Sequence, residues 1–187
     1  FNVSFESLNM EAVKDYGIFN DKVLLDNLRQ KIIQNIIDNT TPNSKNLEEY
    51  INDEIDAALK GYDLTNLERS HIFNLIDNEI NGYGPINELL NDKNITEIMV
   101  NGPSEVYVEI DGKIVRDDTV SFINEEHILR IIQKMVQPLG KTIDTINPMV
   151  DSRLPDGSRI NAIIPPLSLK GPVLTIRKFR DNLNSID

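Results

Sequence analysis

Apolar residues recur every three to four positions in three stretches of the first 82 residues, a spacing that places them on one face of a helix. Thr65 and Glu68 form a capping box before the third stretch, and Gly61 and Gly82 are placed to end the second and third helices. Short amphipathic helices are not stable alone, so the pattern predicts a three-helix bundle over residues 1–82. The apolar positions are Leu25, Leu28, Ile32, Ile33, Ile36 and Ile37, then Leu47, Ile51, Ile55 and Leu59, then Ile72, Ile76 and Ile80.

Beyond this region the apolar pattern shortens to a period of two, which is typical of strands. Residues 95–100 are predicted to form one strand. Residues 106–110 and 113–116 flank Asp111-Gly112, and an Asp-Gly pair between β-rich runs favours a two-residue hairpin turn.

A helix is predicted after these strands. Asn124 is its N-cap, and Glu125 and Glu126 lie in its first turn, where negative charge is favourable. Pro138 and Gly140 end the helix. Its predicted core face consists of Ile128, Leu129, Ile131, Ile132, Met135 and Val136.

A second hairpin is predicted around residues 154–158, and a last strand over residues 173–178. Strands paired in hairpins with a helix between them predict an α+β fold with a mainly antiparallel sheet. We therefore expect two parts, a helical bundle over residues 1–82 and an α/β domain over residues 83–180.

Composition excludes several classes of function and several kinds of site. The chain has 187 residues with 19 basic and 30 acidic side chains, a net charge of −11, which argues against a general nucleic-acid or anionic-membrane binder. It has no cysteine, which excludes disulfides and thiolate zinc sites. No apolar run approaches the length of a membrane span. The first residue is Phe1 rather than Met, which indicates a trimmed start.

Basic residues are concentrated near the carboxyl end, where residues 153–180 carry six of them against one acid. A three-residue loop over Pro155, Asp156 and Gly157 would place Arg153 opposite Arg159 in the second hairpin. Two like charges directly opposite each other are destabilising. Strand alternation then groups several side chains on one face of the sheet, with Lys178 and Arg180 nearby. The grouped residues are Arg153, Arg159, Arg177 and Thr175, with Asp151 and Asn161 as the next pair.

A multivalent anion such as phosphate would favour this cluster, because guanidinium groups match phosphate oxygens. For Arg153 the simpler interpretation is an ion pair with its near neighbour Asp151. For Arg159 with Arg177 the anion site is preferred. A two-residue loop would separate Arg153 from Arg159, so the geometry depends on the register.

Other candidate sites are weaker. Gly140-Lys141-Thr142 resembles the end of a phosphate loop, but the required preceding glycine is Met135 and a helix stands where the strand should be. His71 and His127, the two histidines, are predicted to be surface or interface residues, since neither has a motif partner. No zinc motif, nucleophile elbow or calcium loop occurs in the sequence, and the acidic runs are interpreted as solvated.

The chain resembles CpaF/TadA-like type II/type IV secretion ATPases over about residues 82–180. The resemblance implies a PAS-like N-terminal domain, with the helices as a variable extension. Residues 181–187 would then begin the linker to a RecA-like domain that carries the phosphate loop. The matching segments are Gly82-Tyr83-Gly84-Pro85-Ile86, Ile95-Thr96-Glu97-Ile98-Met99-Val100-Asn101-Gly102, the run from Pro148 to Pro166, and Leu174-Thr175-Ile176-Arg177-Lys178-Phe179.

Members of that family are cytoplasmic homohexamers at the inner face of the cell membrane, where they power pilus assembly or protein secretion with ATP and Mg²⁺. The resemblance implies that Arg159 and Arg177, and less closely Arg153, reach the ATP phosphates between the two domains. The implied partners are the chain's own RecA-like domain, neighbouring subunits and inner-membrane platform proteins, with no nucleic acid. The chain itself, lacking a phosphate loop, is not expected to hydrolyse ATP.

Two other classes remain open. A regulatory ligand-binding or partner-docking module would have no nucleotide role, and its acidic helices would dock a basic partner. A stand-alone enzyme has the least support, because the sequence offers no metal cluster, catalytic triad or phosphate loop.

Overall fold

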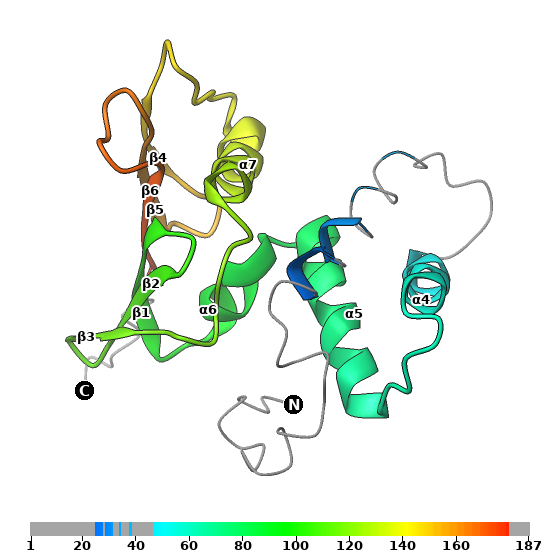
Figure 1. The fold of residues 1–187 in the computed structure, drawn as a ribbon. Coiled ribbons are helices and arrows are strands. Elements are labelled where there is room, and N and C mark those ends of the chain that lie inside the picture. The colour runs from blue at the N-terminus through cyan, green and yellow to red at the C-terminus, as the bar shows by residue number, and fades with distance from the viewer. Residues whose placement is uncertain (1–24, 28, 32–33, 35–37, 39–46, 180–187) are drawn as a thin grey trace. The chain divides into compact units, whose positions relative to one another are not determined.

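The computed structural model describes residues 25–27, 29–31, 34, 38 and 47–179, and the chain divides into two compact units. The helical unit covers residues 1–84 and the α+β unit covers residues 85–187 (Figure 1). No helix in the described part of the chain combines the length and apolar content that a membrane span requires.

In the helical unit, α4 spans Leu47–Ala58 and α5 spans Asn66–Asn81. Their apolar faces meet in a core to which Leu25 contributes from the first predicted helix, whose other apolar positions lie outside the described residues. The buried members of this core are Ile51, Ile55, Leu59, Ile72 and Ile76, as the helical spacing predicts.

The capping box at the start of α5 is confirmed. The backbone N–H of Thr65 donates to Glu68 Oε2 at 2.7 Å, and the backbone N–H of Glu68 donates to Thr65 Oγ1 at 3.2 Å. These two bonds satisfy donors that the first turn of a helix leaves open. His71, on the same helix, is half-buried, and burial followed by the charge of Arg29 lowers the pKa of its imidazole.

The α+β unit contains one six-stranded sheet in the order β3-β2-β1-β6-β5-β4, in which every pair of neighbours is antiparallel. This confirms the predicted α+β class. The last strand, β6, lies between the two hairpins and joins them into one sheet. The elements are η2 Gly84–Ile86, α6 Asn87–Asn91, β1 Ile95–Gly102, β2 Glu105–Ile110, β3 Lys113–Arg116, α7 Glu125–Val136, η3 Gln137–Leu139, β4 Met149–Arg153, β5 Arg159–Ile163 and β6 Val173–Arg177.

Helices α6 and α7 both lie on one side of this sheet (Figure 1), which we call the helix-covered face. Alternate residues of the strands point to it and, except in the exposed strand β3, many of them are almost fully buried. The opposite side, which none of the described helices of the unit covers, is called the open face. The buried core comprises Ile98, Val100, Val106, Val108, Ile160, Ala162, Leu174 and Ile176 from the strands, with Ile128, Ile131, Ile132, Met135 and Val136 from α7.

The prediction that His127 is a surface residue is wrong. The residue is only 4% exposed and takes a core position of α7, whereas Leu129 is half-buried. Its backbone N–H donates to the N-cap Asn124 Oδ1 at 2.8 Å, and its Nδ1 accepts the backbone N–H of Ile123 at 3.1 Å. The imidazole therefore accepts the N–H of the residue before the N-cap, one position earlier than the N–H that Glu accepts in an ordinary capping box, and its ring packs edge-on against Phe122.

Candidate functional site

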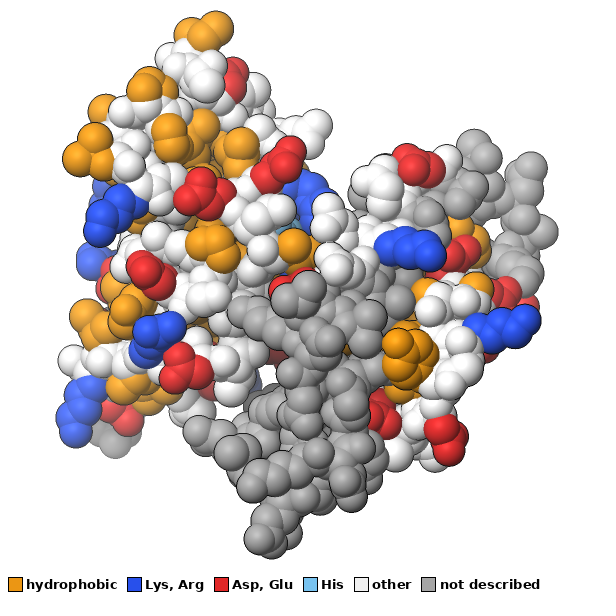
Figure 2. All heavy atoms as spheres, in the orientation of Figure 1, with side chains coloured by type: hydrophobic (Ala, Val, Ile, Leu, Met, Phe, Trp, Pro, Cys, Tyr) orange, Lys and Arg blue, Asp and Glu red, His pale blue; other side chains and the backbone are white. Residues whose placement is uncertain are grey.

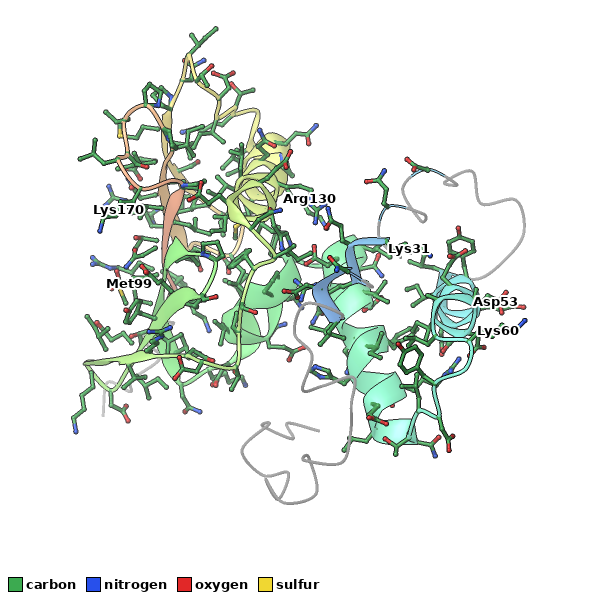
Figure 3. The ribbon with its side chains drawn as sticks, viewed as in Figure 1. Lys31, Asp53, Lys60, Met99, Arg130 and Lys170 are labelled. Carbon is green, nitrogen blue, oxygen red and sulfur yellow. The ribbon has the colours of Figure 1, made fainter. Side chains whose placement is uncertain are left out.

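The open face of the sheet carries the polar residues that alternate with the core. Figure 3 shows Met99 of β1 directed to this side, whereas Arg130 projects from the outer side of α7. In Figure 2 basic side chains line the margin of the α+β unit on the side away from α7.

The strand register arranges the charges of the open face in one row across five strands. Glu109 faces Glu97, Glu97 faces Arg177, Arg177 faces Arg159, and Arg159 faces Arg153. Four steps between neighbouring strands make this row about 19 Å long. Two acids thus occupy one end of the row and three arginines the other.

The predicted hairpin register is confirmed. Leu154 N–H donates to Ser158 O at 2.7 Å and Gly157 N–H donates to Leu154 O at 2.9 Å, which closes the three-residue loop. Asp156 Oδ1 accepts the backbone N–H of Ser158 at 2.9 Å and stabilises the turn.

Arg159 is the most firmly held of the three arginines. Its Nε and Nη2 donate to the two carboxylate oxygens of Asp151 at 3.1 and 2.8 Å, a two-pronged ion pair. This hydrogen bonding lowers the pKa of Asp151 and raises that of Arg159. The pairing corrects the expectation that Asp151 binds Arg153. Asp151 and Arg159 are diagonal neighbours on adjacent strands, within reach of a long side chain.

The other two arginines are held less tightly. Arg177 Nη2 lies 3.7 Å from Glu97 Oε2, and its side chain is 73% exposed. Arg153 is exposed and makes no ion pair or side-chain hydrogen bond within the part of the chain that the structure describes. Both guanidinium groups are therefore accessible to an outside anion.

Lys178 has a different role from the neighbouring arginines. Its ammonium donates to the backbone carbonyls of Leu89 and Asp92, at the end of α6. Burial lowers the pKa of this amine. Lys178 therefore ties β6 to α6, and it also lines the groove that the three arginines line. Arg180 lies outside the described residues.

A groove of about 590 Å³ runs along the charged row. Glu97 and Glu109 line one part of it and the three arginines another, and Phe179 and Gly157 contribute an apolar wall. The arrangement suits a ligand with several negative charges at the arginine end. No cluster of three metal-binding side chains occurs within the described residues.

Sequence reasoning did not identify Glu97, Glu109 and Phe179 as part of the site. The alternation of β1 and β2 places both acids on the open face, but their position beside the arginines depends on the β1–β6 pairing. Lys141, from the rejected phosphate-loop fragment, donates from Nζ to Asp151 O at 2.9 Å and supports β4.

Comparison with known proteins gives a family match. The family model described as type II/IV secretion system protein matches residues 79–187, more than half of the chain. The match includes every strand of the sheet and all three arginines of the row.

Curated relatives show partial similarity. An uncharacterized protein of Methanocaldococcus jannaschii, MJ0781, is 37% identical over 93 residues, which is 50% of this chain and 13% of that protein. The putative conjugal transfer protein Rv3659c of Mycobacterium tuberculosis is 28% identical over 112 residues, 57% of this chain and 32% of its own. The type IV secretion system protein VirB11 of Bartonella henselae is 38% identical over 98 residues, 50% and 26% of the two chains.

Among solved structures, the VirB11 ATPase from the Brucella suis type IV secretion system, in complex with sulphate, aligns with a TM-score of 0.46 and 26% identity. That alignment covers 54% of this chain and 31% of the VirB11 chain. The present chain thus spans about a third or less of the length of these relatives. On the family match, the chain belongs to the type II/IV secretion system protein family.

Proposed function

We propose that the α+β unit is the PAS-like N-terminal domain of a CpaF/TadA-like secretion ATPase, and that its arginine row binds the phosphates of ATP. The supporting observation is the row itself, in which three arginines from adjacent strands share one open face. A guanidinium group stays charged at every working pH and matches phosphate oxygens in geometry.

The three arginines differ in their proposed roles in phosphate binding, because they differ in how firmly the protein holds them. Asp151 holds Arg159 in a fixed orientation, so Arg159 positions the ligand without further ordering. Arg177 and Arg153 are exposed and close on the phosphates when the ligand arrives. The ligand removes the repulsion between the opposed arginines, and this release of repulsion favours binding.

The chain's sequence has no phosphate loop, so hydrolysis is assigned to a RecA-like domain of the longer protein. That domain would supply the phosphate loop and the Mg²⁺ site. The arginines then act across the domain boundary, where positive charge stabilises the transferring phosphoryl group and couples closure to nucleotide state.

Exposed apolar side chains support a role in assembly. Ile146 and Leu169 are 86% and 98% exposed, and Met149 and Leu167 are more than half exposed. Ile146 precedes β4, Met149 is the first residue of β4, and Leu167 and Leu169 follow β5, whose last residue Ile163 pairs with Met149. Such a patch is typical of a protein contact. We assign this patch to contact with the RecA-like domain or with a neighbouring subunit of a homohexamer. The hexamer would lie at the cytoplasmic side of the inner membrane and work with membrane platform proteins.

Calorimetric titration of the 187-residue chain with Mg-ATP tests the phosphate site. Arg159→Ala and Arg177→Ala are each expected to weaken binding about 10–100-fold, the loss of one charge-assisted interaction. Arg116→Ala is the matched control, because Arg116 is an exposed arginine of β3 outside the groove. Equal affinities for all three variants and the unmodified chain would contradict the proposal.

A further inference from the structure

Phe179 is a large apolar side chain beside the arginine row, and it is 56% exposed. It follows Arg177 by two positions, which places it on the same side of the extended chain, about 7 Å further along. Both residues line the same groove. An exposed aromatic ring next to clustered arginines requires an explanation that the phosphate site alone does not give.

The ring is held in place by the hairpin turn. A Cβ atom on Gly157 would lie 3.0 Å from Phe179 Cγ and 3.2 Å from Cδ2, so the ring rests directly on the bare turn. The φ angle of Gly157 is +87°, a conformation that side chains rarely adopt. The backbone N–H of Phe179 donates to Ser158 Oγ at 3.3 Å. The Cβ, Cγ and Cδ2 atoms of Phe179 therefore lie close to the turn, and 56% of the residue remains exposed to solvent.

We propose that Phe179 is the platform on which the base of a purine nucleotide stacks while its phosphates lie on the arginine row. This inference rests on the proposed nucleotide site and adds the base subsite to it. An aromatic ring whose Cβ, Cγ and Cδ2 atoms already lie close to the turn offers stacking at little cost in side-chain freedom. Base–aromatic stacking contributes about 1–3 kcal/mol and does not depend on hydrogen bonds to the base.

A base platform at Phe179 would distinguish ATP from tripolyphosphate, which the arginines alone cannot do. Tripolyphosphate carries the same anionic groups as ATP but has no base. Phe179 should therefore strengthen the binding of Mg-ATP and leave the binding of tripolyphosphate unchanged. The ring is expected to act on affinity for the base, and the arginines on affinity for both ligands.

The test titrates the 187-residue chain with Mg-ATP and with tripolyphosphate. Phe179→Ala is expected to lower ATP affinity about 5–150-fold, which corresponds to the stacking free energy. Its tripolyphosphate affinity should stay within about twofold, a difference smaller than 0.5 kcal/mol. Phe179→Leu keeps an apolar side chain without an aromatic face and should behave like Phe179→Ala, whereas Phe179→Tyr should retain the preference for ATP.

Fluorescence gives a second readout. The chain has no tryptophan, so the Phe179→Trp variant carries a single indole. Mg-ATP should quench that indole and tripolyphosphate should not, since only ATP brings a base to stack on it.

The outcomes distinguish the two proposals. Equal affinity for ATP and tripolyphosphate, unchanged by Phe179→Ala, would overturn the base platform and leave the arginine site standing. Absence of binding by either ligand, or binding that Arg159→Ala does not weaken, would overturn both the arginine site and the platform.

Discussion

Arg159 faces Arg177 directly across the β5–β6 ladder, with both guanidinium groups on the open face of the sheet. Asp151 and Glu97 stand on the outer sides of this pair and offset part of its repulsion. The sheet thus keeps like charges adjacent in the middle of a charged row, an arrangement that costs stability when no anion is bound.

Removing Arg153 should stabilise the free protein. Arg153 stands opposite Arg159 and makes no ion pair of its own among the described residues. Arg153→Thr, which keeps a residue favoured in strands, is expected to raise the free energy of unfolding by about 0.2–1 kcal/mol at low ionic strength. Urea unfolding at low and high salt measures this, and the gain should shrink as salt screens the repulsion. A loss of stability at low salt would contradict the unfavourable arginine pairing.

The ion pair between Asp151 and Arg159 should be visible in the titration of the carboxyl group. Hydrogen bonds from Arg159 lower the pKa of Asp151, so its NMR titration midpoint is expected below the ordinary value of 3.8. The pair's contribution to stability is therefore present above that pH and is lost as pH falls through the lowered pKa. In Arg159→Ala the midpoint should rise toward 3.8. An Asp151 titration that Arg159→Ala leaves unchanged would mean that the pair does not form in solution.

His127 should matter for stability rather than for binding. His127→Phe keeps a buried ring but removes the acceptor of the half-buried Ile123 N–H, and loss of this hydrogen bond is expected to cost about 0.5–1.5 kcal/mol. Gln137→Ala, at the exposed residue that follows α7, serves as the control and should change stability by less than about 0.5 kcal/mol. Amide hydrogen exchange of α7 in the two variants measures the difference. Equal protection in both would show that the imidazole is not a helix cap.

The hydrogen bonds from Lys178 to the end of α6 should stabilise the start of the α+β unit. Lys178→Met keeps the apolar stem but loses the ammonium that donates to the carbonyls of Leu89 and Asp92, at a cost of about 1.5–3 kcal/mol. Lys113→Met, at an exposed position of β3, is the matched control. Faster amide exchange in α6 is expected for the first variant only. Similar exchange in both would argue against the tie.

Local sequence signals predicted much of the fold because they act over a few residues. The Asp111-Gly112 pair and the Pro155-Asp156-Gly157 loop set the registers of the two hairpins, with Asp111 and Gly112 at φ angles of 51° and 75°. Alternation along each strand then placed Arg153, Arg159 and Arg177 on one face. Each of these inferences needed only turn chemistry and a period of two.

The neighbours of the arginines required long-range information. Glu97 faces Arg177 because β6 inserts between β1 and β5, and no local pattern specifies a pairing between strands so far apart in the sequence. Asp151 forms its ion pair with Arg159 rather than with Arg153 because of side-chain geometry across two strands. His127 was assigned to the surface or an interface because it has no motif partner, whereas its imidazole accepts a backbone N–H at the buried start of α7.

Lys178 is joined to Arg177 by a single peptide bond, and its ammonium is fastened to the end of α6. A slip of β6 by one residue would exchange the two side chains between the faces of the sheet and break that fastening at the same time. The lysine thus helps to fix the register of β6, and with it the position of Arg177 in the charged row. A displacement of α6 would therefore be passed to the backbone of Lys178 and so to the neighbouring residue Arg177.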